Sequence, residues 1–168
     1  MISISAIQCF TSPEKSARSI PLVENLDIQK FTLNKWYEIS RIPIPIGSDW
    51  VNTTSTYTIK KDSELSAMYE GFSETPTGKK KSLSGKAKLE SNSLWQISYI
   101  PFLYSDFRII KVSPDYQNAI VTSGTKDFLW ILCKNPKMDE KIYTEYLEFS
   151  KQNGFDISKL EKVLQDWK

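Results

Sequence analysis

The sequence contains no histidine. This absence excludes Ser-His-Asp and Cys-His catalysis, together with the usual imidazole metal sites. Cysteine is scarce as well, because Cys9 and Cys133 are the two in the whole chain. Two thiols are too few for a structural zinc site or a multi-disulfide scaffold, although they could pair with each other. We therefore expect neither a metal centre nor a cofactor.

Long apolar runs are missing too, since no stretch approaches the ~18 residues that a membrane-spanning helix needs. The N-terminal segment MISISAIQCF is apolar but short, and no basic residues precede it, so we do not expect a complete signal peptide. Cys9 could still be the lipid-anchor cysteine of an envelope protein whose signal begins upstream, although Gln8 stands where a small residue is usual. The alternative is an irregular tail on a cytoplasmic protein.

The bulk composition is that of an ordinary globular protein. A length of 168 residues favours one domain, and the net charge of +2 gives no reason to expect a nucleic-acid partner. Aromatic residues make up 12% of the chain, which is enough to enclose something flat or apolar. We expect residues 1–25, which carry Ser, Pro and charge, to form an irregular N-terminal arm, and residues 26–168 to form the domain.

Eight strand-like segments rich in β-branched and aromatic residues follow one another, with short polar links between them. They lie at 36–44, 53–60, 65–72, 82–90, 95–100, 106–112, 116–122 and 127–134. Such a series is typical of an antiparallel up-and-down sheet, which removes its exposed edges by closing into a barrel. An eight-stranded barrel has room for side chains or for one small ligand, and both alternatives are open at this point.

The apolar pattern changes to a helical period after the last strand. Residues 139–154 are expected to form a helix, with Asp139 as its N-cap and Gly154 just past its end. Its apolar stripe must cover a surface, and the predicted barrel is the available one. The predicted fold is therefore all-β: an eight-stranded antiparallel up-and-down barrel with one C-terminal α-helix packed on the outside.

Three separated motifs resemble the lipocalin family, especially its bacterial outer-membrane, plant temperature-induced and apolipoprotein D-type members. The motifs are Trp-Tyr-Glu-Ile at 36–39 with Arg41, Pro-Asp-Tyr at 114–116, and LWILCK at 129–134. The chain departs from the family pattern in having Asn34 in place of a glycine two residues before the tryptophan. Asn tolerates a left-handed turn, so the turn geometry can survive.

The resemblance implies how one end of the barrel is closed. Trp36 would enter the barrel floor at the start of the first strand, with the cation at the end of the last strand lying over its face. That cation is Lys134 here, where the family usually has arginine. Lysine can still make a cation–π contact, although it lacks the planar stacking of arginine. Pro43 and Pro45 would end the first strand near the open mouth.

The resemblance and the two-residue period of strands together predict the lining of the barrel. If Trp36 points inward, alternate residues of its strand and of the last strand do so as well, whereas Cys133 faces outward beneath the helix. The family pattern adds threonines from the second strand and aromatic residues around Pro101. The predicted ligand-binding residues are Glu38, Ser40, Ile42, Thr54, Thr56, Thr58, Ile97, Tyr99, Phe107, Ile109, Phe128 and Trp130.

This lining suits a small hydrophobic ligand such as a fatty acid or a lysophospholipid, in membrane lipid maintenance. One alternative is a lipid-acting enzyme of the isomerase or de-epoxidase type, with Glu38 as the candidate acid–base group; we expect Glu38 to hydrogen-bond in the barrel floor instead. Another is a peripheral membrane contact, in which Lys79–Lys81, Lys86 and Lys88 face acidic head groups. A homodimer is possible by analogy with the family.

Overall fold

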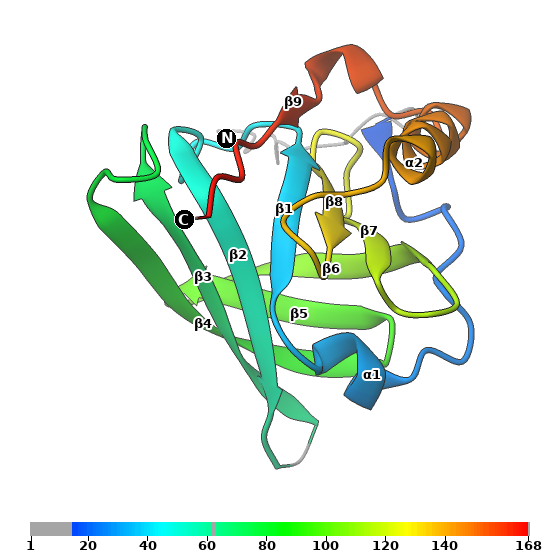
Figure 1. Cartoon of the computed structure of the whole chain (residues 1–168). Coiled ribbons are helices and arrows are strands. Elements are labelled where there is room, and N and C mark those ends of the chain that lie inside the picture. Colours follow the sequence, from blue (N-terminus) through cyan, green and yellow to red (C-terminus); the bar gives the residue numbers. More distant parts are fainter. Residues whose placement is uncertain (1–14, 62, 168) are drawn as a thin grey trace, which may run out of the picture.

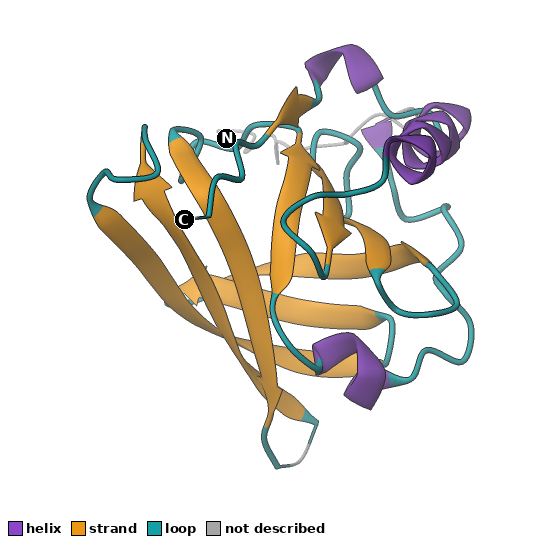
Figure 2. Cartoon of the chain, in the orientation of Figure 1, coloured by secondary structure: helices purple, strands orange, loops and turns teal. Residues whose placement is uncertain are grey.

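The computed structural model describes residues 15–61 and 63–167, which form the barrel shown in Figures 1 and 2. Eight antiparallel strands make up its wall, each paired with the next along the chain. Their bounds are β1 Trp36–Arg41, β2 Trp50–Ile59, β3 Glu64–Ser73, β4 Lys80–Ser91, β5 Leu94–Ile100, β6 Leu103–Val112, β7 Asn118–Thr122 and β8 Leu129–Cys133. The predicted fold class is confirmed.

Strand β1 closes the barrel because it pairs with β8 on one side and with β2 on the other. The β1–β2 ladder is short, with Trp36 opposite Ser55 and Tyr37 opposite Thr54. Beyond these pairs the two strands diverge toward the open end of the barrel (Figure 1). On the edge that it shares with β2, β1 pairs further along with the short strand β9, Glu161–Lys162, which the sequence did not predict.

The chain after β9 fills the gap between the diverging parts of β1 and β2. The side-chain Nε2 of Gln165 donates to the carbonyl of Glu38 on β1 at 2.9 Å and to that of Thr53 on β2 at 3.1 Å. The N–H of Asn52 donates to the carbonyl of Leu164 at 2.8 Å. The C-terminal segment therefore satisfies backbone groups of both strands that would otherwise lack partners.

Two α-helices lie at different places on the barrel (Figure 2). Helix α1, Ile28–Thr32, crosses the closed end and begins at Asp27, whose carboxylate accepts two backbone N–H bonds. Helix α2, Glu140–Gln152, begins at the predicted N-cap Asp139 and packs its buried face on the outer wall. It is followed by Gly154 in the left-handed region at φ 80°, and by the 3-10 turn η2, Ile157–Lys159.

Two apolar clusters lie on opposite sides of the barrel wall. The inner cluster lies inside the barrel and at its floor, and contains Leu26, Phe31, Trp36, Tyr57, Leu65, Ala67, Ala87, Trp95, Ile97, Phe107, Ile109, Ala119, Val121 and Leu132. The outer cluster lies between the wall, helix α2 and the N-terminal arm, and contains Ala17, Ile20, Ile39, Ile42, Ile110, Ile120, Leu129, Ile131, Cys133, Met138, Tyr143, Tyr146 and Phe155. A side chain's direction can therefore be judged from the cluster that it joins.

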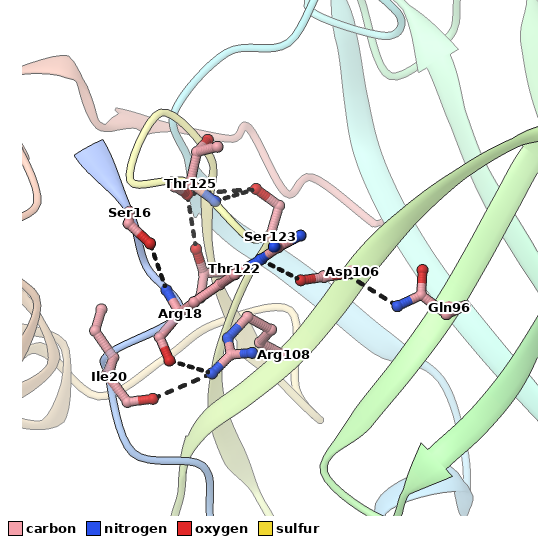
Figure 3. Close-up of polar contacts among 9 residues, drawn as sticks. All are labelled: Ser16, Arg18, Ile20, Gln96, Asp106, Arg108, Thr122, Ser123 and Thr125. Atoms are coloured by element: carbon pink, nitrogen blue, oxygen red, sulfur yellow. Dashed lines mark hydrogen bonds and ion pairs between the residues drawn. The ribbon is translucent and has the colours of Figure 1, made fainter. Parts of the chain in front are cut away.

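Figure 3 shows the polar contacts that hold the N-terminal arm against β6 and the loop between β7 and β8. Arg108 on β6 is buried and donates Nη2 to the carbonyls of Arg18 at 3.2 Å and Ile20 at 3.3 Å. The Nε of Arg18 pairs with Asp106 at 3.3 Å. The described part of the arm, residues 15–25, thus packs onto the barrel, and the domain boundary at residue 26 stays a prediction.

Candidate functional site

The closed end of the barrel is sealed by Trp36 beneath Lys134. Trp36 has no exposed surface, and its indole Nε1 donates to the carbonyl of Phe31 at 2.9 Å. The Nζ atom of Lys134 lies 3.8 Å from the centroid of the Trp36 ring and donates to the carbonyls of Phe31, Leu33 and Asn34 at 3.0, 2.6 and 3.1 Å. Asn34 adopts φ 63°, the left-handed turn that its residue type tolerates.

The Lys134 ammonium is subject to opposing effects. Burial lowers its pKa to about 7, because the charged form loses hydration. The three carbonyl oxygens and the indole face favour the charged form, because they offer partial negative charge to the cation. The closed end therefore holds a cation whose charge responds to pH near neutrality.

Aromatic rings fill the lower half of the interior above this seal. Phe31 lies 4.9 Å from Trp36 and 5.7 Å from Trp95, measured between ring centroids. Trp95 stacks on Phe107 at 4.7 Å, and Tyr57 contacts the edge of Trp95 at 5.0 Å. Burial raises the pKa of Tyr57, so its hydroxyl stays protonated at neutral pH. This half of the barrel is a packed floor.

The upper half of the interior is lined by half-buried side chains. Tyr69 stacks on Trp50 at 5.4 Å and lies 6.4 Å from Tyr99. Phe128 stacks on Trp130 at 6.3 Å on the opposite wall. These five rings border the open mouth. Trp50 is buried and the other four are half-buried, so the four present some apolar surface there.

One charged pair lies within this aromatic lining. Glu38 and Arg41 are 1% and 4% exposed, and the guanidinium Nη1 lies 3.4 Å from Glu38 Oε2. The hydroxyl of Tyr69 donates to the same oxygen at 2.8 Å. Arg41 Nη2 donates to the carbonyls of Ser48 at 2.7 Å and Trp50 at 3.0 Å. Burial, followed by the charge of Glu38, raises the pKa of Tyr69, so this hydroxyl remains a donor.

Seven of the predicted lining residues face the interior. Ile97, Phe107 and Ile109 belong to the inner cluster, and Tyr99 and Trp130 pack against it. Phe128 stacks on Trp130, and Glu38 lies opposite Leu132 of the inner cluster. The structure thus brings these residues together inside the barrel, and their contact with a ligand stays a prediction.

Ser40 and Ile42 point the other way, so the inward direction predicted for them is wrong. Ser40 shares a hydrogen bond of 2.8 Å with the hydroxyl of Tyr143 on helix α2, and Ile42 belongs to the outer cluster. A β-bulge is the cause, since the pairing of β1 with β8 shifts between Glu38 and Ser40. One extra residue, Ile39, reverses the alternation, and Arg41 rather than Ser40 faces inward.

Thr54, Thr56 and Thr58 also face outward, in contrast to the prediction. Residues directly opposite each other in an antiparallel ladder share a face, and Trp36 lies opposite Ser55. Tyr57, two residues further along, belongs to the inner cluster. The residues of β2 that face inward are therefore the odd-numbered ones, such as Ser55 and Tyr57. The three even-numbered threonines lie on the outer side.

Sequence reasoning missed several interior residues that matter to the site. Arg41 stands in the WYEISR motif, yet strict alternation placed it on the outside. Three large aromatic residues of predicted strands were also missed, namely Tyr57, Tyr69 and Trp95. Their size was the signal that could have shown which alternate residues of each strand face inward. Trp50 begins β2 three residues before the predicted start of that strand.

Apolar side chains are exposed at the mouth of the barrel. The hairpin between β5 and β6 carries Ile100, Phe102, Leu103 and Tyr104, and Phe102 at its tip is 97% exposed with φ 66°. The neighbouring hairpin at the same end, between β3 and β4, carries Lys79–Lys81. Apolar and basic groups thus lie together around the opening.

Two surface hollows lie outside the barrel. One, of about 530 Å³, surrounds the closed end and is lined by Lys30, Leu33, Asn34, Lys35, Tyr37, Asp115, Tyr116, Gln117, Lys134 and Asn135. The other, of about 330 Å³, is lined by Asn52, Phe72, Pro76, Thr77, Asp166 and Trp167. None of the predicted ligand-binding residues lines either hollow, and their contact with a ligand inside the barrel stays a prediction.

The remaining sequence features concern cysteine, metals and membranes. Cys133 is buried in the outer cluster, and burial raises the pKa of its thiol. Cys9 lies outside the described residues, so neither its pairing with Cys133 nor its lipidation is tested. Within residues 15–61 and 63–167, no three Cys, Asp or Glu side chains are arranged to hold a metal ion. In the same ranges no helix is both long and apolar enough to cross a bilayer.

Known proteins resemble this chain over most of its length. A family model described as a lipocalin-like domain matches residues 26–165. Temperature-induced lipocalin-1 of Arabidopsis thaliana is 28% identical, over 88% of this chain and 84% of that protein. The outer membrane lipoprotein Blc of Escherichia coli K12 is 27% identical, over the same shares. The solved structure of the cockroach allergen Per a 4 shares the fold, with a TM-score of 0.68 and 17% identity over 91% of this chain and 96% of the allergen.

Proposed function

Because this chain belongs to the lipocalin family, whose members bind small hydrophobic ligands, we propose that it binds, stores or transports an elongated lipid inside its barrel, in membrane lipid maintenance. The ligand would be a fatty acid, a lysophospholipid or a similar molecule. The observation that carries this proposal is a closed barrel sealed at one end by Trp36 and lined at the other by half-buried rings. Such an interior offers apolar contact with one way in.

The energetics of burial support this proposal. Burying an acyl chain yields about 0.8 kcal/mol per methylene, so a long chain gains roughly 10 kcal/mol before the costs of association. Those costs amount to several kcal/mol. The remainder corresponds to micromolar or tighter binding, which requires no covalent step.

Two measurements test the proposal. Mass spectrometry of an organic extract from the purified protein should detect a bound lipid, and a fluorescent fatty acid should bind saturably and be displaced by unlabelled lipid. A matched pair of variants locates the site. Leu83→Trp adds bulk on the inner face opposite Tyr69 and should weaken binding at least tenfold, whereas Ser84→Trp adds the same bulk on the exposed outer face and should not. A wild-type protein that takes up no lipid would end the proposal.

We propose binding without catalysis. Glu38 is the candidate acid–base group of the isomerase-type alternative, and its carboxylate is held by Arg41 and Tyr69. A carboxylate fixed in an ion pair favours a structural or ligand-orienting role over proton transfer. If purified protein converted a lipid substrate and Glu38→Gln abolished the turnover, the enzyme alternative would replace this proposal.

We further propose that the mouth of the barrel contacts a membrane surface. The exposed tip at Phe102 supports this proposal, because an aromatic side chain gains free energy at the boundary of a bilayer. The nearby lysines at 79–81 would attract acidic head groups. Lys86 and Lys88 lie further along β4 toward the closed end, so they stand apart from this contact. Contact at the mouth would let a lipid pass between membrane and barrel without crossing water. Homodimerisation stays a separate prediction.

The cell envelope is the location we propose for this contact. The relative Blc is named an outer membrane lipoprotein, and Cys9 stands near the start of the chain as a possible anchor. Fractionation of cells followed by mass analysis of the N-terminal peptide tests this location. A lipid-modified Cys9 in the membrane fraction, lost in Cys9→Ser, is the expected result. Recovery of unmodified protein in the cytoplasm would favour the cytoplasmic alternative.

A further inference from the structure

The ion pair of Glu38 and Arg41 uses only part of its hydrogen-bonding capacity. Glu38 Oε2 receives the Tyr69 hydroxyl and Arg41 Nη1, and Arg41 Nη2 donates to two carbonyls. Glu38 Oε1 and Arg41 Nε are both buried, and neither has a hydrogen-bond partner among the described residues. An unpaired buried polar group costs about 1–3 kcal/mol, so native structures rarely keep two in one cluster without a purpose.

The two unpaired atoms are chemically complementary. Glu38 Oε1 can only accept a hydrogen bond, and Arg41 Nε–H can only donate one. The charges of the carboxylate and the guanidinium compensate each other, so the site carries no net charge. A single group that donates and accepts at once, such as a hydroxyl, would satisfy both atoms.

The position of the pair suits the polar end of an elongated ligand. Arg41 lies opposite Trp130 on β8, and Tyr69, which binds Glu38, stacks on Trp50. These rings belong to the upper interior, whereas the floor beneath is packed with aromatic side chains. A lipid that enters through the mouth would therefore reach this polar pair by displacing the side chains that bury it.

We propose, on the basis of the function proposed above, that Glu38 Oε1 and Arg41 Nε–H hold a hydroxyl group of the bound lipid. The preferred ligand is then a long-chain amphiphile whose polar end inside the barrel is an uncharged hydroxyl, as in a fatty alcohol or in the glycerol of a monoacylglycerol. A fatty acid anion is disfavoured, because a carboxylate has no proton to donate to Glu38 and brings a second negative charge beside it. An ester accepts a bond from Arg41 but leaves Glu38 unpaired.

Competition binding with ligands of equal chain length tests this selectivity. The fluorescent apolar probe N-phenyl-1-naphthylamine is loaded into the full-length protein at neutral pH and displaced with hexadecanol, monopalmitin, methyl palmitate or palmitate. Hexadecanol should displace the probe at an at least tenfold lower concentration than palmitate, with methyl palmitate in between. Monopalmitin distinguishes a glycerol hydroxyl from a simple alkyl one.

Glu38→Gln is the diagnostic variant, because it removes the negative charge and introduces an amide donor. Its affinity for palmitate should rise, so the tenfold preference for hexadecanol should fall below threefold. Glu70→Gln is the matched control, since Glu70 lies on the outer face of β3 paired with Lys80 at 2.9 Å. This control should keep the wild-type preference. Equal displacement by all four ligands, or a preference for palmitate, would overturn the inference while leaving lipid binding intact.

A pH series on the wild-type protein keeps the inference testable if Glu38→Gln does not fold. Protonated palmitic acid offers both a donor and an acceptor, so its affinity should rise as pH falls through the ligand's own pKa, while that of hexadecanol stays level. Palmitate affinity independent of pH would contradict the inference. A wild-type protein that binds neither the probe nor any of the ligands would instead refute the proposed function, and this inference with it.

Discussion

The ammonium nitrogen of Lys134 lies 3.8 Å from the centroid of the Trp36 ring, and it also donates to one carbonyl oxygen of α1 and two of the α1–β1 connection. One side chain therefore ties the end of the last strand to the start of the first at the barrel floor. Lys134→Met should lower the free energy of unfolding by about 2 kcal/mol, because it removes a cation–π contact and three charge-assisted hydrogen bonds. Denaturant unfolding measures this, with Lys137→Met on the exposed loop as control. Equal stabilities of the two variants would contradict the prediction.

The lowered pKa of Lys134 predicts a pH-dependent stability. Its pKa is about 7 in the folded protein and near 10.4 when unfolded, so between these values the unfolded chain binds more protons. The free energy of unfolding that this residue contributes should therefore rise with pH above 7, by roughly 0.5 kcal/mol per pH unit. This slope is smaller than the ~1.4 kcal/mol per pH unit of a fully buried group, because the Lys134 ammonium is partly exposed. The measurement is the difference in unfolding free energy between wild type and Lys134→Met across this range. A constant difference would mean that the carbonyls and the indole keep the ammonium charged.

The buried pair of Glu38 and Arg41 should be strongly coupled. Arg41→Met leaves the Glu38 carboxylate buried without its cation, which should cost about 3–5 kcal/mol of stability. The double variant Glu38→Met/Arg41→Met should lose less than the sum of the two single variants, by at least ~1 kcal/mol. Lys80→Met breaks the exposed pair with Glu70 and should cost less than ~1 kcal/mol. Additive single-variant effects would show that the buried pair is not coupled.

Gln165 should stabilise the seam between β1 and β2. Gln165→Leu leaves the carbonyls of Glu38 and Thr53 without this donor, so we expect a loss of about 1–2 kcal/mol. Hydrogen exchange at the Asn52 N–H, which donates to the adjacent Leu164 carbonyl, should become faster. Gln152→Leu on the exposed side of α2 serves as control. An unchanged exchange rate at Asn52 would show that the C-terminal segment keeps its contact with β2 without Gln165.

Phe102 should contribute to membrane binding. Phe102→Ser removes the exposed ring at the mouth, and binding to vesicles containing anionic phosphatidylglycerol should weaken roughly fivefold, or about 1 kcal/mol. Leu33→Ser removes an apolar side chain that is 64% exposed at the closed end and should have no effect. Binding by wild type should also weaken as salt is raised. Vesicle binding equally reduced by both variants would argue against docking through the mouth.

Local features of the sequence predicted the elements of the barrel. β-branched and aromatic runs with polar links indicated the eight strands, and Asp139 and Gly154 marked the two ends of the long helix. Asn34 adopts the left-handed backbone conformation that was expected before Trp36. Each of these depends on the conformational preferences of a few neighbouring residues, which a sequence displays directly.

The lining was predicted well where a strand keeps its alternation and poorly where it does not. Ile97 and Ile109 were placed correctly from aromatic neighbours two residues away. Ser40 was misplaced because the bulge at Ile39 inserts a residue that no local pattern announces. Thr56 was misplaced because the frame of β2 is set by its partner strand, through Ser55 opposite Trp36.

The sequence by itself determined that this chain forms a closed eight-stranded barrel with an outer helix and a tryptophan at its floor, because strand period, helix caps and motifs are short-range properties. Only the tertiary structure decided that Glu38 and Arg41 meet inside it and that Gln165 bridges β1 and β2. Those contacts depend on a bulge and on cross-strand register. Both are set by hydrogen bonds between segments far apart in the chain, which the order of residues along one strand does not reveal.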